Sequence, residues 1–86
     1  MNHRATRDFW DHYQRLPKAV QQVADKNFRL LKDDPYHPSL HFKKIHAELW
    51  SARVGLDYRA LATPVRGGTF LWFWIGTHEM YERLIG

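Results

Sequence analysis

The 86-residue sequence contains no cysteine, which excludes a disulfide framework, a thiolate nucleophile and a cysteine-ligated zinc finger. Its longest apolar run, FLWFWIG at residues 70–76, is far shorter than the roughly 20 apolar residues that cross a bilayer. The first residues, MNHRATRD, lack the apolar stretch of a secretory signal peptide. We therefore expect a single cytoplasmic domain over residues 1–86, with no membrane segment.

Several catalytic signatures are also missing. There is no Gly-rich phosphate loop, no G-x-S-x-G elbow and no paired-carboxylate motif, so nucleotide hydrolysis, esterase and glycosidase activities have no support. His37, His41 and His46 do not form a metal-binding motif, because Pro38 interrupts any helix that would align the first two and no carboxylate completes a familiar spacing. We expect neither a metal nor a cofactor.

Positive charge is present in excess, and it is local. Thirteen Lys and Arg face nine Asp and Glu, which gives a net charge of +4. Residues 35–47 contain two lysines, three histidines and no acid. Such a stripe is typical of a surface that binds a polyanion or an acidic partner, and it is equally compatible with an ordinary solvated surface.

The hydrophobic pattern changes from a helical to an extended period after Pro38. Thr6 is suited to cap a first helix, and Pro17 is suited to the first turn of a second helix that Asp33-Asp34-Pro35 ends. The predicted elements are a helical hairpin over residues 7–15 and 17–33, extended segments at 40–45, 49–54, 58–63 and 69–76, and a short helix at 78–85.

This order of elements predicts an α+β fold, in which a helical hairpin packs on a small antiparallel sheet and a short C-terminal helix follows. The segment TFLWFWIG is apolar on both faces and is predicted to be a central strand. In the last helix, Met80, Tyr81, Leu84 and Ile85 are predicted to face the sheet.

Two arginines are expected to oppose each other across the hairpin of the 49–54 and 58–63 segments. If Gly55, Leu56 and Asp57 form the loop, Arg53 faces Arg59 on the side away from the core. Opposed like charges destabilise a sheet unless an anion lies between them, so the pair is a candidate phosphate clamp. The alternative is that Asp57, Glu48 or Glu79 neutralises one arginine, or that the register differs.

Side chains suited to proton transfer and RNA binding flank this pair. His78 and Tyr81 are spaced i, i+3 at the start of the last helix, and they are suited to proton exchange and to hydrogen bonding or base stacking. A helix-start hydrogen bond for His78 and core packing for Tyr81 are the structural alternatives. His41, Lys43 and Lys44 are predicted to form a basic rim beside the arginines, or else a solvated face.

Three segments, DPYHPSLHFKKI, LWSARVGLDYRAL and WFWIGTHEMYERLI, resemble the RelE/ParE superfamily of type II toxins, in particular its compact RelE/HigB-like branch. The three segments occur in the family's order, and the resemblance covers nearly the whole chain from Phe9 to Leu84. It implies the toxin of a toxin–antitoxin system, a metal-independent endoribonuclease (mRNA interferase) that cleaves mRNA in association with the ribosome and inhibits translation. It also implies a cognate antitoxin as partner.

The resemblance assigns roles to individual residues. Arg53 matches a basic residue of the middle strands, Arg59 matches the arginine of the family's Y-R motif, His78 lies where members carry Arg or His, and Tyr81 matches the terminal tyrosine. These four are the expected catalytic residues. Ser51 stands where the best-known members have a second strand lysine.

The expected RNA-binding residues are His41, Lys43, Lys44 and Ser51. No glutamate base aligns ahead of the strand, although His41 and Lys44 lie nearby. Two other functions remain open from the sequence: a ParE-like poison of DNA gyrase, and a degenerate module that only binds an antitoxin.

Overall fold

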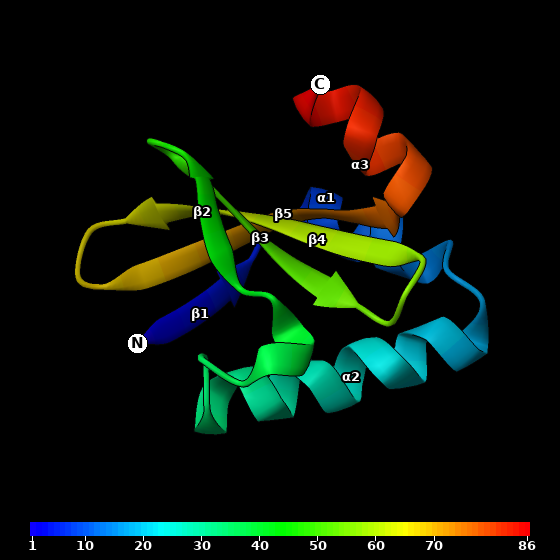
Figure 1. Cartoon of the computed structure of the whole chain (residues 1–86), viewed down its shortest axis with the longest axis horizontal. Helices are drawn as coiled ribbons and strands as arrows, with labels where there is room; N and C mark the ends of the chain where they lie inside the picture. The colour runs from blue at the N-terminus through cyan, green and yellow to red at the C-terminus, as the bar shows by residue number, and fades with distance from the viewer.

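The computed structural model describes all of residues 1–86. The chain folds into a five-stranded sheet with helices on both faces (Figure 1). This architecture confirms the predicted α+β fold class, including the helical hairpin and the short C-terminal helix. None of the helices is long and apolar enough to cross a membrane. In chain order the elements are β1 (Asn2–Ala5), α1 (Arg7–Gln14), α2 (Lys18–Asp33), the 3-10 helix η1 (Pro38–Leu40), β2 (Lys43–His46), β3 (Leu49–Val54), β4 (Tyr58–Val65), β5 (Thr69–Thr77) and α3 (His78–Ile85).

The strands are arranged in the order β1-β5-β4-β3-β2, and β5 pairs on both sides, with β1 and with β4. A register irregularity in the β4–β5 ladder lies between the pairs Ala62–Trp72 and Leu61–Trp74. Because the extra residue of a bulge reverses the alternation of side chains, Trp72 packs in the cluster beneath α1 and α2, whereas Trp74 packs with α3. This explains why the strand is apolar on both faces.

Strand β1 was not predicted from the sequence. It runs parallel to β5, so the sheet is mixed rather than wholly antiparallel. Its residues NHRA are polar and alternate between exposed and half-buried positions, so their composition carries no strand signal. The pairing instead depends on the partner strand, and the side chains reinforce it, because Trp72 Nε1 donates a hydrogen bond to His3 Nδ1 at 3.0 Å.

The helical hairpin covers one face of the sheet, in Figure 1 the side on which α2 lies. Thr6 caps α1 as predicted, because its hydroxyl oxygen accepts a hydrogen bond from the Phe9 amide at 3.1 Å. Apolar side chains of both helices pack on buried residues of β3, β4 and β5. This cluster is the main core, and it consists of Leu31, Leu40, Ala52, Val54, Ala60, Ala62, Trp72 and Ile75.

Helix α3 lies on the opposite face and follows β5 directly (Figure 1). Thr77 ends the strand and caps the helix by accepting a hydrogen bond from the Met80 amide at 3.1 Å. Tyr81 and Ile85 pack against the sheet, as predicted. The prediction was wrong for Met80 and Leu84, which remain 48% and 56% exposed, because a helix of two turns lying on a sheet buries only a narrow stripe.

Candidate functional site

The β3–β4 hairpin places two arginines directly opposite each other. Gly55 starts the turn with a φ of 66°, a left-handed conformation that glycine adopts without steric penalty. The register pairs Arg53 with Arg59, which confirms the predicted opposition of the two residues. They alternate onto the same face as Ser51, the residue that contacts α3 through Tyr81.

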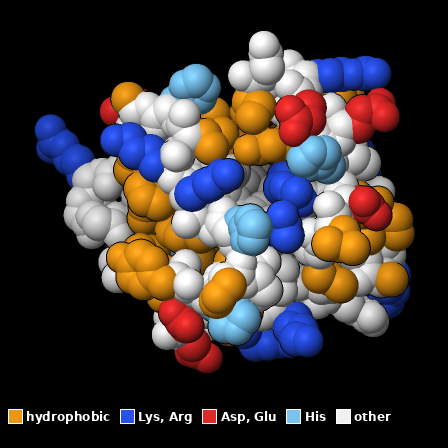
Figure 2. Space-filling view, viewed as in Figure 1, with side chains coloured by type: hydrophobic (Ala, Val, Ile, Leu, Met, Phe, Trp, Pro, Cys, Tyr) orange, Lys and Arg blue, Asp and Glu red, His pale blue; other side chains and the backbone are white.

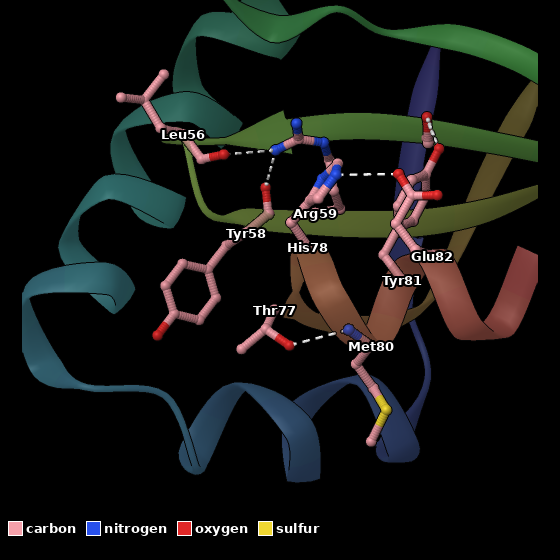
Figure 3. A network of polar contacts seen from close by, with 9 residues as sticks. Leu56, Tyr58, Arg59, Thr77, His78, Met80, Tyr81 and Glu82 are labelled. Atoms are coloured by element: carbon pink, nitrogen blue, oxygen red, sulfur yellow. Dashed lines mark hydrogen bonds and ion pairs between the residues drawn. The ribbon is translucent and has the colours of Figure 1, made fainter.

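Arg59 is held by backbone carbonyls rather than by an acid. Its Nη1 donates to the carbonyl oxygens of Tyr58 at 2.7 Å and Leu56 at 3.3 Å (Figure 3). Desolvation by burial lowers the pKa of Arg59, and the positive charge of Arg53 lowers it further. No ion pair involves either arginine, since the two pairs in the protein are His78–Glu82 and Arg83–Glu79. Arg59 is therefore held in place without an ion-pair partner, and the nearby acids Glu82 and Asp57 only partly offset the lowering of its pKa.

Arg53 has an unused hydrogen-bond donor. Its Nε atom is buried and has no partner, while its backbone carbonyl accepts a hydrogen bond from Asn27 Nδ2 at 3.2 Å. A buried donor without an acceptor is unfavourable in the free protein. An anion bound between the two arginines would supply that acceptor and would relieve the repulsion between the charges.

Helix α3 brings three further side chains to this hairpin. His78, whose amide donates to the Asp57 carbonyl at 2.7 Å, places Nε2 at 3.0 Å from Glu82 Oε1, one helical turn further on (Figure 3). The ring of His78 lies 5.8 Å from that of Tyr81, centroid to centroid. The hydroxyl of Tyr81 donates to Ser51 Oγ at 3.4 Å.

These residues line one polar cleft with a volume of about 180 Å³. Figure 2 shows Lys, Arg and His side chains gathered around the centre of this face of the molecule. Seven of the eight site residues predicted from the sequence lie together here, although they come from four different elements and the segment before β2. The lining consists of His41, Lys43, Ser51, Arg53, Arg59, His78, Tyr81, Glu82 and Ile85.

Lys44 is the predicted site residue that does not line the cleft. It pairs with Trp50 in the β2–β3 ladder, whereas Lys43 pairs with Ser51. Because consecutive residues of a strand point to opposite faces, Lys43 reaches the cleft and Lys44 is directed to the other face of the sheet. The sequence could not separate the two lysines without the register.

Tyr81 and Ser51 form the floor of the cleft rather than its rim. Their exposed fractions are 6% and 3%, and Tyr81 packs against Leu61 and Trp74. Tyr81 therefore packs in the core, one of the alternatives that the sequence left open, and it also lines the cleft. Base stacking on its ring is not possible in this arrangement, because the ring is covered.

His41 lies at the other side of the site, between η1 and β2. Its φ of 43° makes it the one residue other than glycine with a positive φ, and it caps η1 in a left-handed conformation. Such backbone strain is frequent at functional sites. The three histidines His37, His41 and His46 do not gather with acidic residues into a metal-ligating cluster.

Glu82 is a lining residue that the sequence analysis did not select. Its spacing of i+4 from His78 was the available signal, since that spacing brings two side chains together on a helix.

A second cavity of about 200 Å³ lies between α1, α2 and the sheet, and 13 of its 18 lining residues are hydrophobic. Its five polar lining residues are His3, Arg4, Asp25, Asn27 and Arg53, and Arg53 lines both cavities.

No protein-family model and no curated protein sequence matches this chain. Its structure is similar to several solved structures. A RelB–RelE antitoxin–toxin complex from Methanococcus jannaschii matches with a TM-score of 0.73 and 15% identity, over 96% of this chain and 99% of that chain. The toxin–antitoxin complex RelBE2 from Mycobacterium tuberculosis matches with a TM-score of 0.69 and 22% identity, over 90% and 96%.

A YoeB/ParE toxin from Agrobacterium tumefaciens gives a TM-score of 0.68 and 20% identity, over 91% of this chain and 99% of that chain. In each case the match covers nearly the full length of both chains. The chain therefore has the RelE/ParE-like toxin fold.

Proposed function

We propose that this protein is the toxin of a type II toxin–antitoxin system and acts as a metal-independent endoribonuclease on mRNA. One observation carries the proposal: two arginines oppose each other without a counter-ion, in a cleft that also contains two histidines. Cations for a phosphate and groups that exchange protons near neutral pH are what RNA cleavage without a metal requires.

The reaction is an intramolecular attack by a ribose 2′-hydroxyl on the adjacent phosphorus. The hydroxyl gives its proton to a base, a 2′-O–P bond forms, the P–O5′ bond breaks, and the leaving O5′ receives a proton. The products are a 2′,3′-cyclic phosphate and a 5′-hydroxyl, and atoms and charge balance without a co-reactant. DNA is not a substrate for this reaction, because it lacks the 2′-hydroxyl.

Each cleft residue has a role in this scheme. Arg53 and Arg59 bind the scissile phosphate and stabilise the charge that develops on it, and Lys43 extends the cationic surface along the strand. His41 and His78, which come from different elements, hold the two proton-transfer roles. Tyr81 supports the floor of the cleft through its contact with Ser51.

An antitoxin and mRNA are the proposed partners, with the ribosome as the setting for cleavage. The similar structures from M. jannaschii and M. tuberculosis are complexes of toxin with antitoxin. In this chain the net charge of +4 and the unneutralised arginines favour an acidic segment that covers the cleft. The proposed site of action is the cytoplasm, where mRNA is translated.

The test is cleavage of RNA by the Arg59→Ala variant. We expect cleavage of mRNA, alone or on translating ribosomes, to fall by at least about 100-fold, as occurs when a transition-state charge stabiliser is removed. Arg66→Ala is the matched control, since Arg66 is an exposed arginine in the β4–β5 loop and its loss changes the net charge equally. Thermal unfolding verifies that both variants are folded.

A folded Arg59→Ala variant that cleaves RNA as well as the wild type would exclude this site. Wild-type protein that cleaves no RNA with or without ribosomes, but causes gyrase–DNA adducts on expression, would instead support a gyrase poison. Protein that does neither and still binds an antitoxin would be a binding module.

A further inference from the structure

The cleft contains a single acidic side chain among its nine lining residues, and this acid contacts a histidine instead of an arginine. Glu82 lies 3.0 Å from His78 Nε2 and forms no ion pair with Arg53 or Arg59. The charge of Glu82 also acts on Arg59, where it partly offsets the lowering of the pKa. Its one ion-pair contact, however, is with the imidazole of His78.

The contact determines what His78 presents to the cleft. An ionised carboxylate only accepts hydrogen bonds, so the nitrogen facing Glu82 must carry a hydrogen. The other ring nitrogen, Nδ1, is buried and has no partner. Nε2 is therefore the nitrogen through which His78 exchanges protons with a bound molecule, and in the free protein it is a donor.

Glu82 is the one carboxylate that shares the cleft with His78. The other charged or titratable side chains there are Lys43 on β2, Arg53 on β3, Arg59 on β4, His41 before β2 and Tyr81 on α3, and the Asp57 carbonyl accepts from the His78 amide. The cations in this set disfavour an imidazolium ion, and so does Nδ1, because it is buried without an acceptor. Glu82 is the one group in the cleft that stabilises this ion.

We propose that Glu82 is a positioning residue that holds a proton on Nε2 of His78, so that His78 acts as the proton donor to the leaving 5′ oxygen. The proposal rests on the proposed ribonuclease function. In the reaction the Nε2 proton of the imidazolium moves to O5′ as the P–O5′ bond breaks, which leaves a neutral imidazole. The other proton, that of the 2′-hydroxyl, moves to His41 as this hydroxyl attacks the phosphorus. Glu82, with 58% of its side chain exposed, acts only through its contact with the imidazole of His78.

The first measurement does not depend on catalysis. We expect Glu82→Gln to move the NMR titration midpoint of the His78 ring to lower pH at low salt, because the substitution removes the carboxylate that accepts from Nε2. Glu79→Gln is the matched control, because Glu79 forms the same i, i+4 contact on the same helix, with Arg83 at 3.2 Å, and lies outside the cleft. It is expected to leave the His78 midpoint unchanged.

The second measurement is the pH dependence of RNA cleavage. In Glu82→Gln the decline of kcat at high pH should begin at a lower pH than in the wild type, while KM stays equal or falls because an acid that repels RNA has been removed. An acid with only a structural role would change the stability of the fold and leave both midpoints in place.

The two measurements separate the two proposals. An unchanged His78 midpoint in Glu82→Gln, or an equal shift in Glu79→Gln, overturns the role of Glu82 whether or not the protein cleaves RNA. Wild-type protein that cleaves no RNA overturns the ribonuclease function, and the shift in the His78 midpoint then still reports on the contact. A shifted midpoint with an unshifted kcat profile assigns the proton donation to another residue and also overturns the proposal.

Discussion

Replacing Arg53 with Met should stabilise the protein while it weakens binding of RNA. The change removes a charge directly opposite Arg59 and a buried Nε–H that has no acceptor, and it retains an unbranched apolar stem. Opposed like charges on neighbouring strands cost up to about 1 kcal/mol. An unpartnered buried donor costs at least about 1 kcal/mol. We therefore expect the free energy of unfolding to rise by about 1–2 kcal/mol and Tm to rise by at least about 4 °C.

Urea unfolding of the wild type and Arg53→Met, at about 20 mM and about 500 mM NaCl, measures this effect and its origin. The gain should shrink at high salt, because salt screens the repulsion between the two arginines. Inorganic phosphate should stabilise the wild type more than the variant, since binding to the folded state raises its stability. Arg66→Met, at an exposed and unopposed arginine, should stay within about 0.5 kcal/mol of the wild type. If Arg53→Met proved less stable than the wild type at low salt, the account of an unneutralised pair would be wrong.

Two further predictions concern the elements that hold the site in place. Thr77→Ala should lower the free energy of unfolding by about 1 kcal/mol, because the Met80 amide loses its cap, and Thr77→Ser should restore most of it; urea unfolding of the two variants measures this. The pKa of His3 is lowered from 6.5, chiefly by burial and secondarily by the charges of the N-terminus and Lys32. Just below pH 6.5 the His3 ring therefore binds a proton more readily in the unfolded chain than in the folded protein. Stability should therefore fall as the pH drops below 6.5, and less steeply in His3→Gln, where an amide oxygen replaces the ring nitrogen that accepts from Trp72. Equal slopes in the two proteins would contradict the assignment to His3.

Much of the fold could be predicted because its local signals agree with one another. Gly55 and the alternation of apolar and polar residues in LWSARVG determine both the hairpin and its register, so the opposition of Arg53 and Arg59 followed from the sequence. Strand β1 could not be found in this way. Its pairing with β5 depends on a partner almost 70 residues away in the sequence and on contacts of His3 with Trp72 and Phe70, which no local pattern encodes.

The candidate site was predictable only as a set of residue types. Which side chains share the cleft depends on the register of β2 against β3, and this register separates Lys43 from Lys44. The sequence offered Glu79 as a partner for the arginines and did not select Glu82, because only the placement of α3 relative to the hairpin shows that Glu82 lines the cleft and that Glu79 pairs with Arg83. Tertiary placement, rather than propensity, decides both points.

The most direct test of the central claim is to identify the products that form when an mRNA is translated in the presence of this protein. The account predicts fragments that end in a 2′,3′-cyclic phosphate and begin with a 5′-hydroxyl. It also predicts that a 2′-deoxy nucleotide placed at a cleavage site, or the Arg59→Ala substitution, abolishes the cut. Fragments that persist with the 2′-deoxy nucleotide, or that Arg59→Ala still produces at the wild-type rate, would contradict it.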